Sequence, residues 1–271
     1  MQWPFQPHTP STPESVRPKR SSPSLGRPGA QPRVATLSFP RKHSLADILV
    51  IGASALAREA LNVIRSGSEH RACGVLDDSP PRWGTSIGGV PVLGGVDTVA
   101  QYPGASLVIC VSLGSTRARL VNRLQDLGVR DDRYAQLIHP SVEVPRNCRV
   151  GVGSIILAGV VMTADVMIGR HVVIMPNVTL THGNRIQSFA TLGAGSALGP
   201  GVRVGEEATL GMNSTVRDRV RVGDRSVLGL GSALLRDQPP GETWMGVPAA
   251  PNRTTETTAS NTPPLRSIGN F

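Results

Sequence analysis

Residues 191–216 read TLGAGSALGPGVRVGEEATLGMNSTV, and an aliphatic residue recurs in this stretch at every sixth position. Counted in steps of six in both directions, every position from residue 138 to residue 234 is apolar. The positions are Ile138, Val144, Val150, Ile156, Met162, Ile168, Ile174, Leu180, Ile186, Leu192, Leu198, Val204, Leu210, Val216, Val222, Leu228 and Leu234. At the chain's apolar content, chance would give such a run on the order of once in ten million. Residues 138–250 therefore form a repeat with a period of six.

Two other features accompany the aliphatic residue of each repeat. Two places before it the side chain is mostly small or a valine, and one place after it glycine recurs. The small residues are Ser154, Ala190, Ser196, Ala208, Ser214, Ser226 and Ser232, and the glycines are Gly151, Gly169, Gly193, Gly199, Gly205, Gly211, Gly223 and Gly229. A thin solenoid needs an apolar centre, small corner residues and glycines that adopt dihedral angles other residues avoid. Three rungs to a coil predict about five coils of a parallel β-helix.

Residues 46–137 alternate between strand-like and helix-like segments, as a parallel α/β unit requires. ADILVIGA (46–53) is typical of a buried strand, and residues 55–67 follow with apolar side chains on one helical face. Two more strands are expected at ACGVLDD (72–78) and LVICVSL (107–113), and Ser115 is a candidate N-cap of a second helix. The pattern predicts a small Rossmann-like domain.

The two ends of the chain differ from this middle part. Residues 1–45 carry seven Lys and Arg against one acid, nine prolines and many serines, which predicts a disordered basic tail. This composition is faintly similar to an organelle transit peptide, and an extension from an upstream start codon is an equal alternative. Residues 251–271, rich in Thr, Ser and Pro, are expected to form a second flexible tail.

Composition excludes several classes of protein. The basicity lies in the N-terminal tail and aromatic residues are 3% of the chain, which argues against nucleic-acid binding. No apolar run reaches the ~20 residues of a membrane-spanning helix. Both lysines, Lys19 and Lys42, precede the predicted domains, which excludes lysine-based phosphate binding and Schiff-base chemistry there. Three scattered cysteines indicate neither a disulfide framework nor a zinc site, and a reducing cytoplasm is the expected location.

The hexad array resembles the left-handed β-helix of hexapeptide-repeat acyltransferases. With the preceding α/β unit, the chain resembles the sugar and sialic-acid acetyltransferases that include PglD- and NeuD-like proteins, over about residues 46–250. The segments that carry the resemblance are VIGASALAREAL (50–61), GVLDD (74–78), IGGVPVLGG (87–95), LIHPSVEV (137–144), LTHGNRI (180–186) and RDQPPGETWMGVPAA (236–250).

The resemblance implies transfer of an acetyl group from acetyl-CoA to an amine or hydroxyl of a sugar, within a homotrimer whose sites lie between neighbouring β-helices. His182 occupies the family's histidine position, and an imidazole is suited to accept the proton of the attacking group near neutral pH. The positions that match the family's CoA groove are Thr191, Met212 and Leu230. Met212 and Leu230 are eighteen residues apart and are expected to stack on one edge.

In the N-terminal domain, the resemblance implies a nucleotide-sugar site at the first strand-to-helix turn and at the acids after the second strand. The matching residues are Ser54, Ala55, Leu56, Asp77 and Asp78. Relatives have more glycine in this turn, which lets phosphate approach the backbone at the helix N-terminus. Because Gly52 alone is retained here, a Rossmann unit without a ligand is the alternative.

The chain departs from the family's pattern at two places near the predicted base. Gly183 stands where relatives usually have an acid that orients the histidine, and Thr191 stands where many have a second histidine. A catalytically weak β-helix that binds a ligand or serves as a scaffold is therefore a second hypothesis. The other rung and linker histidines, His139 and His171, are expected to be structural or on the surface, and no metal site is expected.

Overall fold

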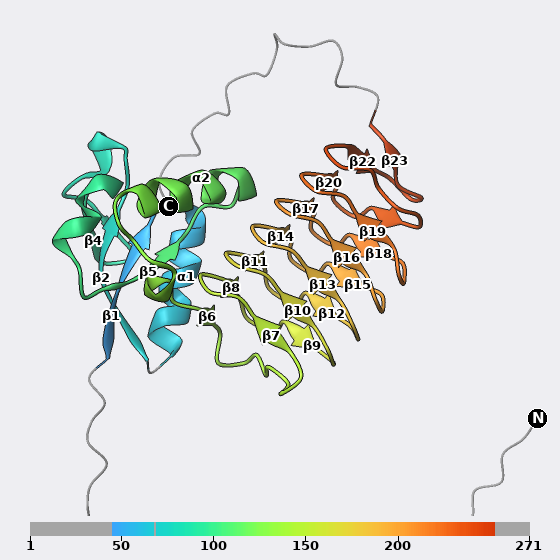
Figure 1. The fold of residues 1–271 in the computed structure, drawn as a ribbon, viewed down its shortest axis with the longest axis horizontal. Coiled ribbons are helices and arrows are strands. Elements are labelled where there is room, and N and C mark those ends of the chain that lie inside the picture. Colours follow the sequence, from blue (N-terminus) through green and yellow to red (C-terminus); the bar gives the residue numbers. More distant parts are fainter. Residues whose placement is uncertain (1–44, 68, 253–271) are drawn as a thin grey trace, which may run out of the picture. The chain divides into compact units, whose positions relative to one another are not determined.

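The computed structural model describes residues 45–67 and 69–252 (Figure 1). The expectations for residues 1–44 and 253–271, which make up nearly all of both predicted tails, lie outside the described residues. Of the predicted tails, the structure describes Leu45, Pro251 and Asn252. Neither α-helix of the described part, at 12 and 13 residues, is long and apolar enough to cross a membrane. In the same ranges, no three His, Cys, Asp or Glu side chains gather as a metal site would require.

The N-terminal part is built on a five-stranded sheet with strand order β3-β4-β2-β1-β5. Strands β1, β2, β4 and β5 are parallel, and β3 pairs with β4 in the antiparallel sense. The strands are β1 (Ala46–Ile51), β2 (His70–Leu76), β3 (Ser86–Ile87), β4 (Val90–Gly94) and β5 (Ser106–Ile109). The helices are α1 (Ala55–Ser66) and α2 (Gly114–Asp126), with short 3₁₀ turns at Pro80–Arg82, Val96–Gln101 and Asp131–Arg133. The predicted α/β unit is thus present.

Two local details explain how the helices begin. Ser54 caps α1 through its hydroxyl, which accepts the N–H of Ala57 at 3.3 Å. The prediction that Ser115 caps the second helix was wrong, because the cap position is two residues earlier, at Leu113, which makes no side-chain cap bond; α2 begins at Gly114. Gly114 packs so closely against the β-helix that a Cβ there would lie 2.3 Å from the carbonyl oxygen of Phe189. Tertiary packing therefore sets the start of α2.

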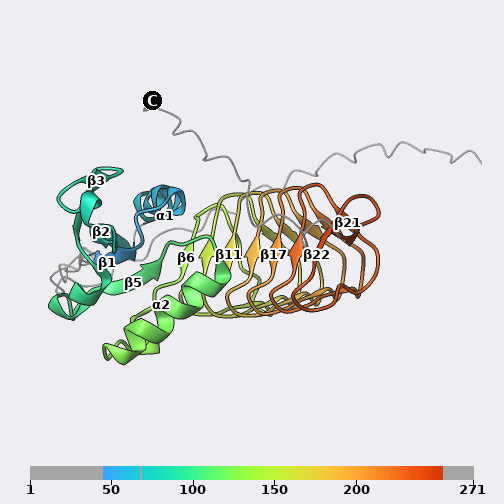
Figure 2. The ribbon, with the colours of Figure 1, turned by 90° about the horizontal axis from the view of Figure 1, so that it is seen from above.

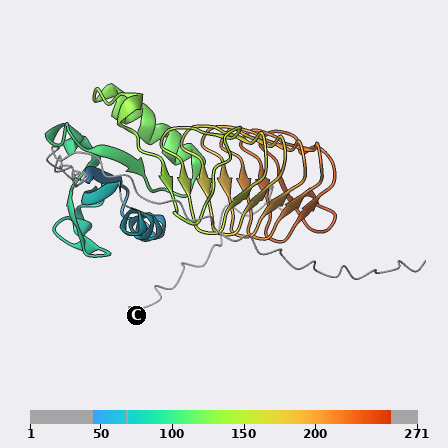
Figure 3. The same cartoon turned by 90° about the horizontal axis from the view of Figure 1, so that it is seen from below.

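The rest of the chain winds through three parallel sheets, which we call sheets I, II and III in chain order within a coil. Figures 2 and 3 show the coils stacked one behind another, with equivalent strands side by side. Sheet I contains β6 (Leu137–Ile138), β8 (Ile155–Ile156), β11 (Val173–Ile174), β14 (Thr191–Leu192), β17 (Thr209–Leu210), β20 (Val227–Leu228), β22 (Thr243–Met245) and an antiparallel end strand, β23 (Ala250–Pro251). Sheet II contains β9 (Val161–Met162), β12 (Thr179–Leu180), β15 (Ala197–Leu198), β18 (Thr215–Val216) and β21 (Ala233–Leu234). Sheet III contains β7 (Arg149–Val150), β10 (Met167–Ile168), β13 (Arg185–Ile186), β16 (Arg203–Val204) and β19 (Arg221–Val222).

The register of the coils confirms the predicted period. Each strand pairs with the strand one coil away, as Leu192 does with Leu210. All seventeen aliphatic positions of the hexads belong to one core cluster, fourteen of them buried and three, Ile138, Val144 and Val150, packed against it while partly buried. The small residues that precede them are buried as well. The repeat therefore encodes a column of aliphatic side chains enclosed by three sheets of short strands.

The predicted reason for the recurrent glycines was wrong. The glycines that directly follow the aliphatic residues do not have positive φ. They are needed because the next coil lies too close: a Cβ on Gly199 would be 2.6 Å from the backbone nitrogen of Asp218. Left-handed backbone occurs two residues later, at Gly201 (φ +70°). Non-glycine residues such as Asp165 (φ 53°) adopt the same conformation at equivalent corners.

His171 lies inside the molecule where the N-terminal part meets the first coils. Its ring packs edge-on against Tyr134, with ring centres 4.6 Å apart, and is stacked on Phe189 at 5.4 Å. Its side chain is fully buried, and within the described residues neither ring nitrogen has a hydrogen-bond partner. Burial, assisted by the charges of Arg170 and Arg117, lowers the pKa of His171 to about 3.

This buried histidine makes stability depend on pH. Because the pKa of His171 is lower in the folded state than its ordinary value of about 6.5, the unfolded chain takes up the proton first as the pH falls. The free energy of unfolding should therefore decrease from about pH 6.5 downward, by on the order of 3 kcal/mol at pH 4. His171→Phe should remove most of this slope in urea unfolding measured from pH 7 to pH 4. An unchanged slope in that variant, matching a His139→Gln control, would contradict the assignment.

Candidate functional site

His182 lies at the corner between β12 and β13, which is the edge between sheets II and III. Its side chain is 67% exposed. Beside it, the next two coils leave an open hollow of about 670 Å³ lined by His182, Pro200, Gly201, Asp218 and Arg219. Gly201 and Pro200 contribute little side chain at this corner, which explains the hollow. The predicted base therefore faces a space that a ligand can enter.

A carboxylate from the preceding coil contacts the ring of His182. Its Nδ1 is 3.3 Å from Oδ2 of Asp165. The other carboxylate oxygen of Asp165 accepts a hydrogen bond of 2.9 Å from the side-chain amide of Asn147. Sequence reasoning missed Asp165, although the signal was available: a residue seventeen positions before the histidine is almost one coil away and stacks beside it.

The predicted CoA positions Met212 and Leu230 lie on a different edge, between sheets I and II. Met212 is 53% exposed and Leu230 is 69% exposed. They occupy neighbouring coils, since the N–H of Gly231 donates to the Met212 carbonyl at 2.9 Å. The expectation that the two residues stack on one edge is thus met, and together they give this edge an exposed apolar surface.

Thr191, the third predicted CoA position, forms hydrogen bonds with the N-terminal part of the chain. Its hydroxyl donates to the carbonyl of Ser112 at 2.9 Å and accepts from the guanidinium of Arg117 at 3.0 Å. It lies in strand β14 rather than at the corner that holds Met212. The hydroxyl therefore has a structural role, and any contact with CoA stays a prediction.

The predicted nucleotide-sugar residues gather around the ends of β1 and β2. Ser54 donates to the carbonyl of Cys110 at 2.6 Å in addition to capping α1, and Leu56 is buried in the core. Ala55 is exposed at the first turn of the helix. Arg82, which sequence reasoning missed, donates to the carbonyl of Ala53 and adds a positive charge to this turn.

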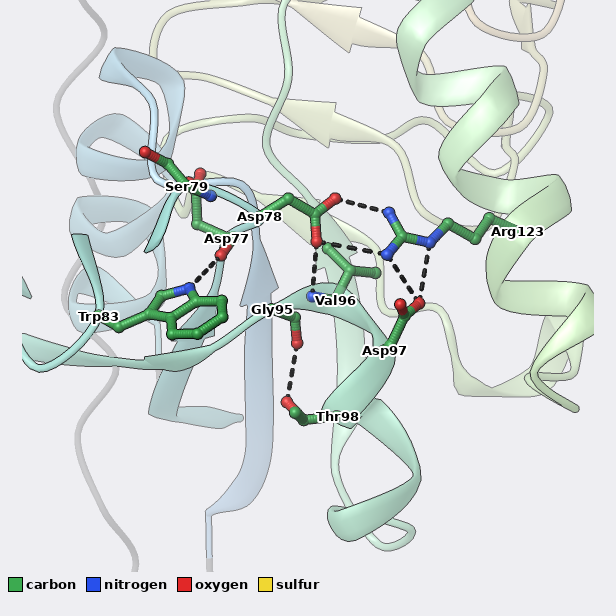
Figure 4. A network of polar contacts seen from close by, with 9 residues as sticks. All are labelled: Asp77, Asp78, Ser79, Trp83, Gly95, Val96, Asp97, Thr98 and Arg123. Atoms are coloured by element: carbon green, nitrogen blue, oxygen red, sulfur yellow. Dashed lines mark hydrogen bonds and ion pairs between the residues drawn. The ribbon is translucent and has the colours of Figure 1, made fainter. Parts of the chain in front are cut away.

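The two acids after β2 bind loops of their own domain (Figure 4). Asp77 accepts the N–H of Ala53 at 2.7 Å and that of Ser79 at 3.0 Å. Asp78 accepts the N–H of Val96 at 3.0 Å and pairs with Arg123 at 2.6 Å.

Arg123 also pairs with Asp97 at 2.7 Å, so its guanidinium joins two loops. Partial burial alone would raise the pKa of Asp78, but the hydrogen bond and charge of Arg123 and the Val96 N–H hold it below its usual value. The carboxylate is therefore ionised and already paired.

Within one chain these groups form separate clusters. His182 and its Asp165 partner lie at one border of sheet II, whereas Met212 and Leu230 lie at the other border. The five strands of sheet II, which separate the two borders, carry only Val, Leu, Met, Thr and Ala. One chain does not bring the predicted base and the predicted CoA edge together.

Comparisons with known proteins show what this chain is similar to. The family described as the PglD N-terminal domain matches residues 47–124. A GDP-perosamine N-acetyltransferase from Caulobacter crescentus, solved with CoA and GDP-perosamine, is 29% identical; the match covers 77% of this chain and 98% of that one, with a TM-score of 0.71. In both of its parts the chain is similar to PglD/NeuD-like sugar acetyltransferases. The left-handed β-helix predicted from the hexads is confirmed by the same relationship.

Two further solved structures share this fold. The acetyltransferase domain of PglB from Neisseria gonorrhoeae, solved with acetyl coenzyme A, is 25% identical over 77% of this chain and 100% of that one, with a TM-score of 0.71. WeeI from Acinetobacter baumannii shares the fold at 20% identity and a TM-score of 0.68, over 77% of this chain and 100% of that one. No curated protein sequence matches the chain.

Proposed function

We propose that this PglD/NeuD-like chain is an acetyltransferase that uses acetyl-CoA to acetylate an amine or hydroxyl of a nucleotide-linked sugar. In this proposal, residues 46–137 bind the nucleotide sugar and residues 138–250 carry the acyl transfer. The observation that carries it is His182, an exposed imidazole that lines an open hollow while a carboxylate contacts its Nδ1. The solved relatives that bind CoA, acetyl coenzyme A or GDP-perosamine support the substrate classes.

His182 acts as the general base. Acetyl-CoA supplies a thioester whose carbonyl carbon is attacked by the sugar's amine or hydroxyl. As the new bond to carbon forms, Nε2 of His182 accepts the proton of the attacking group, and the bond from carbon to the CoA sulfur breaks. The proton then passes to the departing thiolate, which leaves as free CoA thiol.

The acetyl-CoA edge requires apolar surface and room for a long ligand. Met212 and Leu230 supply the apolar surface, because each is more than half exposed. Their place on successive coils gives this surface length along the axis of the β-helix. Since this edge and His182 border opposite sides of sheet II, a complete site requires the edge of a second copy. A homotrimer in which His182 of one protomer meets the acetyl-CoA edge of its neighbour satisfies this requirement.

The nucleotide end of the acceptor is expected at the turn between β1 and α1. The N-terminus of α1 favours anions, and Arg82 lies against this turn. The backbone at Ala55 is accessible, whereas Asp77 and Asp78 position the surrounding loops. These groups suit a phosphate-bearing ligand.

Leu230→Glu should weaken acetyl-CoA binding by about tenfold or more, because it replaces an apolar contact with a carboxylate that repels the CoA phosphates. The measurement is the rise in melting temperature with increasing acetyl-CoA, since a ligand that binds only the folded state stabilises it. Leu127→Glu is the matched control, because Leu127 is an exposed leucine at the C-terminal end of α2, away from both edges of the proposed site. Equal effects of the two variants would contradict the assigned edge.

The activity itself is tested by incubating the purified protein with acetyl-CoA and a panel of nucleotide-linked sugars, including amino sugars, and recording free thiol. Acceptor-dependent thiol release with an acetylated product in the mass spectrum is the expected result. A protein that neither gains stability from millimolar acetyl-CoA nor releases thiol with any acceptor would instead fit a scaffold built on the same fold.

A further inference from the structure

We infer that Asp165, one coil before His182, is the positioning residue for the general base. This inference rests on the proposed function. The resemblance leads us to expect the orienting acid directly after the histidine, and Gly183 leaves that position without a side chain. The contact of 3.3 Å between Asp165 Oδ2 and His182 Nδ1 brings a carboxylate to the same ring from another place in the sequence.

The β-helix register explains how Asp165 reaches the ring of His182. Asn147, Asp165, Gly183 and Gly201 follow one another at steps of eighteen residues and form one column along the edge between sheets II and III. Asp165 therefore lies one coil before Gly183. This places it beside His182, the residue directly before Gly183. One coil before Asp165, the side-chain amide of Asn147 donates to Asp165 Oδ1 at 2.9 Å.

This second contact matters because ion pairs between exposed groups are weak by themselves. The side chains of His182 and Asp165 are 67% and 56% exposed. The Asn147 hydrogen bond restricts the carboxylate so that one oxygen remains directed to the imidazole. Asn147, Asp165 and His182 thus form a chain of three side chains, each from a successive coil.

The chemical consequence follows from the two nitrogens of the ring. A carboxylate at Nδ1 favours the tautomer that carries its hydrogen there, and this tautomer leaves the lone pair on Nε2 for the acceptor's proton. When the ring becomes an imidazolium during transfer, the same carboxylate stabilises the charge. Asp165 therefore acts through His182 and does not touch the substrates.

Gly183 offers a direct test, because the acid can be moved to the expected place. A Cβ on Gly183 would meet nothing closer than 3.9 Å. Its φ of +73° is close to the 53° that Asp165 already adopts, and aspartate is among the residues that tolerate this region. Asp165→Ala combined with Gly183→Asp should therefore fold and carry one acid beside the ring.

For Asp165→Ala we expect kcat to fall about 10–100-fold while KM for acetyl-CoA stays within about twofold. The double variant should recover about tenfold or more of that loss. Glu207→Gln is the matched control, because Glu207 is also an acid at a left-handed corner, on the edge between sheets III and I. Nitrogen NMR of the ring, assigned with His182→Gln, should show the Nδ1–H tautomer in the parent and its loss in Asp165→Ala.

Two results would overturn the inference. One is a parent-like kcat in Asp165→Ala; the other is a double variant that recovers neither kcat nor the Nδ1–H tautomer of His182 relative to Asp165→Ala. The NMR measurement needs no acceptor and remains informative if a variant is catalytically dead. Failure of the proposed function has a different signature, because the parent protein would then release no thiol with any acceptor. The tautomer change would still test the contact between Asp165 and His182.

Discussion

His182→Ala is expected to lower kcat for acetyl transfer by about 10²–10⁴-fold, the range usual for loss of a general base. The side chain is exposed at the edge between sheets II and III and does not belong to the core cluster, so its removal should leave the coils intact. Initial rates of free-thiol release with saturating acetyl-CoA and acceptor give the comparison.

Two controls make the result specific to proton transfer. Acetyl-CoA should raise the melting temperature of His182→Ala as much as that of the parent, because Met212 and Leu230 are unchanged. His139→Ala, at a histidine whose Nδ1 contacts Ser141 at 2.9 Å, should retain its rate. Turnover within about twofold of the parent in His182→Ala would remove the general-base assignment.

Arg117→Met is expected to lower the free energy of unfolding by about 3–5 kcal/mol, the cost typical of breaking a buried charged network. Arg117 is 1% exposed and donates to the β-helix carbonyls of His171 at 2.9 Å, Phe189 at 2.6 Å and Ala190 at 3.0 Å. It also donates to the carbonyls of Val111 and Ser112, at 2.8 and 2.7 Å. Methionine fills the volume but leaves these buried acceptors unpaired.

Burial lowers the pKa of Arg117 to about 10, so the guanidinium is still charged at neutral pH and its carbonyl partners stabilise that charge. Urea unfolding at pH 7 measures the loss. Arg117→Lys should fall between the parent and the methionine variant, because an ammonium has three donors and cannot span all these carbonyls. A loss below about 1 kcal/mol in Arg117→Met would show that the carbonyls find other partners.

The repeat domain could be predicted from sequence because one physical requirement recurs at each rung. An aliphatic residue must fill the narrow core, and the cluster from Ile138 to Leu234 contains every predicted position. The glycines were located correctly but explained wrongly, since the proximity of the next coil, as at Gly199, is a tertiary property. The start of α2 at Gly114 has the same cause.

The candidate site was less predictable because its contacts join residues on different coils or elements. Asp165 could have been found by placing the chain on an eighteen-residue coil, which puts it beside His182. Arg117 carries no such signal, because one arginine in a helix with several others gives no indication that it is buried. Likewise, the sequence located Asp77 and Asp78 at a strand end but not their loop partners.

The central claim is that His182 of one protomer works with the acetyl-CoA edge of another. Mixing His182→Ala and Leu230→Glu chains in equal amounts, with dissociation and reassembly, tests it directly when acetyl-CoA is kept too dilute to fill the weakened Leu230→Glu edge. Under that condition each variant alone lacks one half of every site. If the chains form trimers with shared sites, each mixed trimer has one intact site, and the mixture should regain about a quarter of the parent's thiol release. A mixture that reassembles yet stays as inactive as its two components would contradict the account.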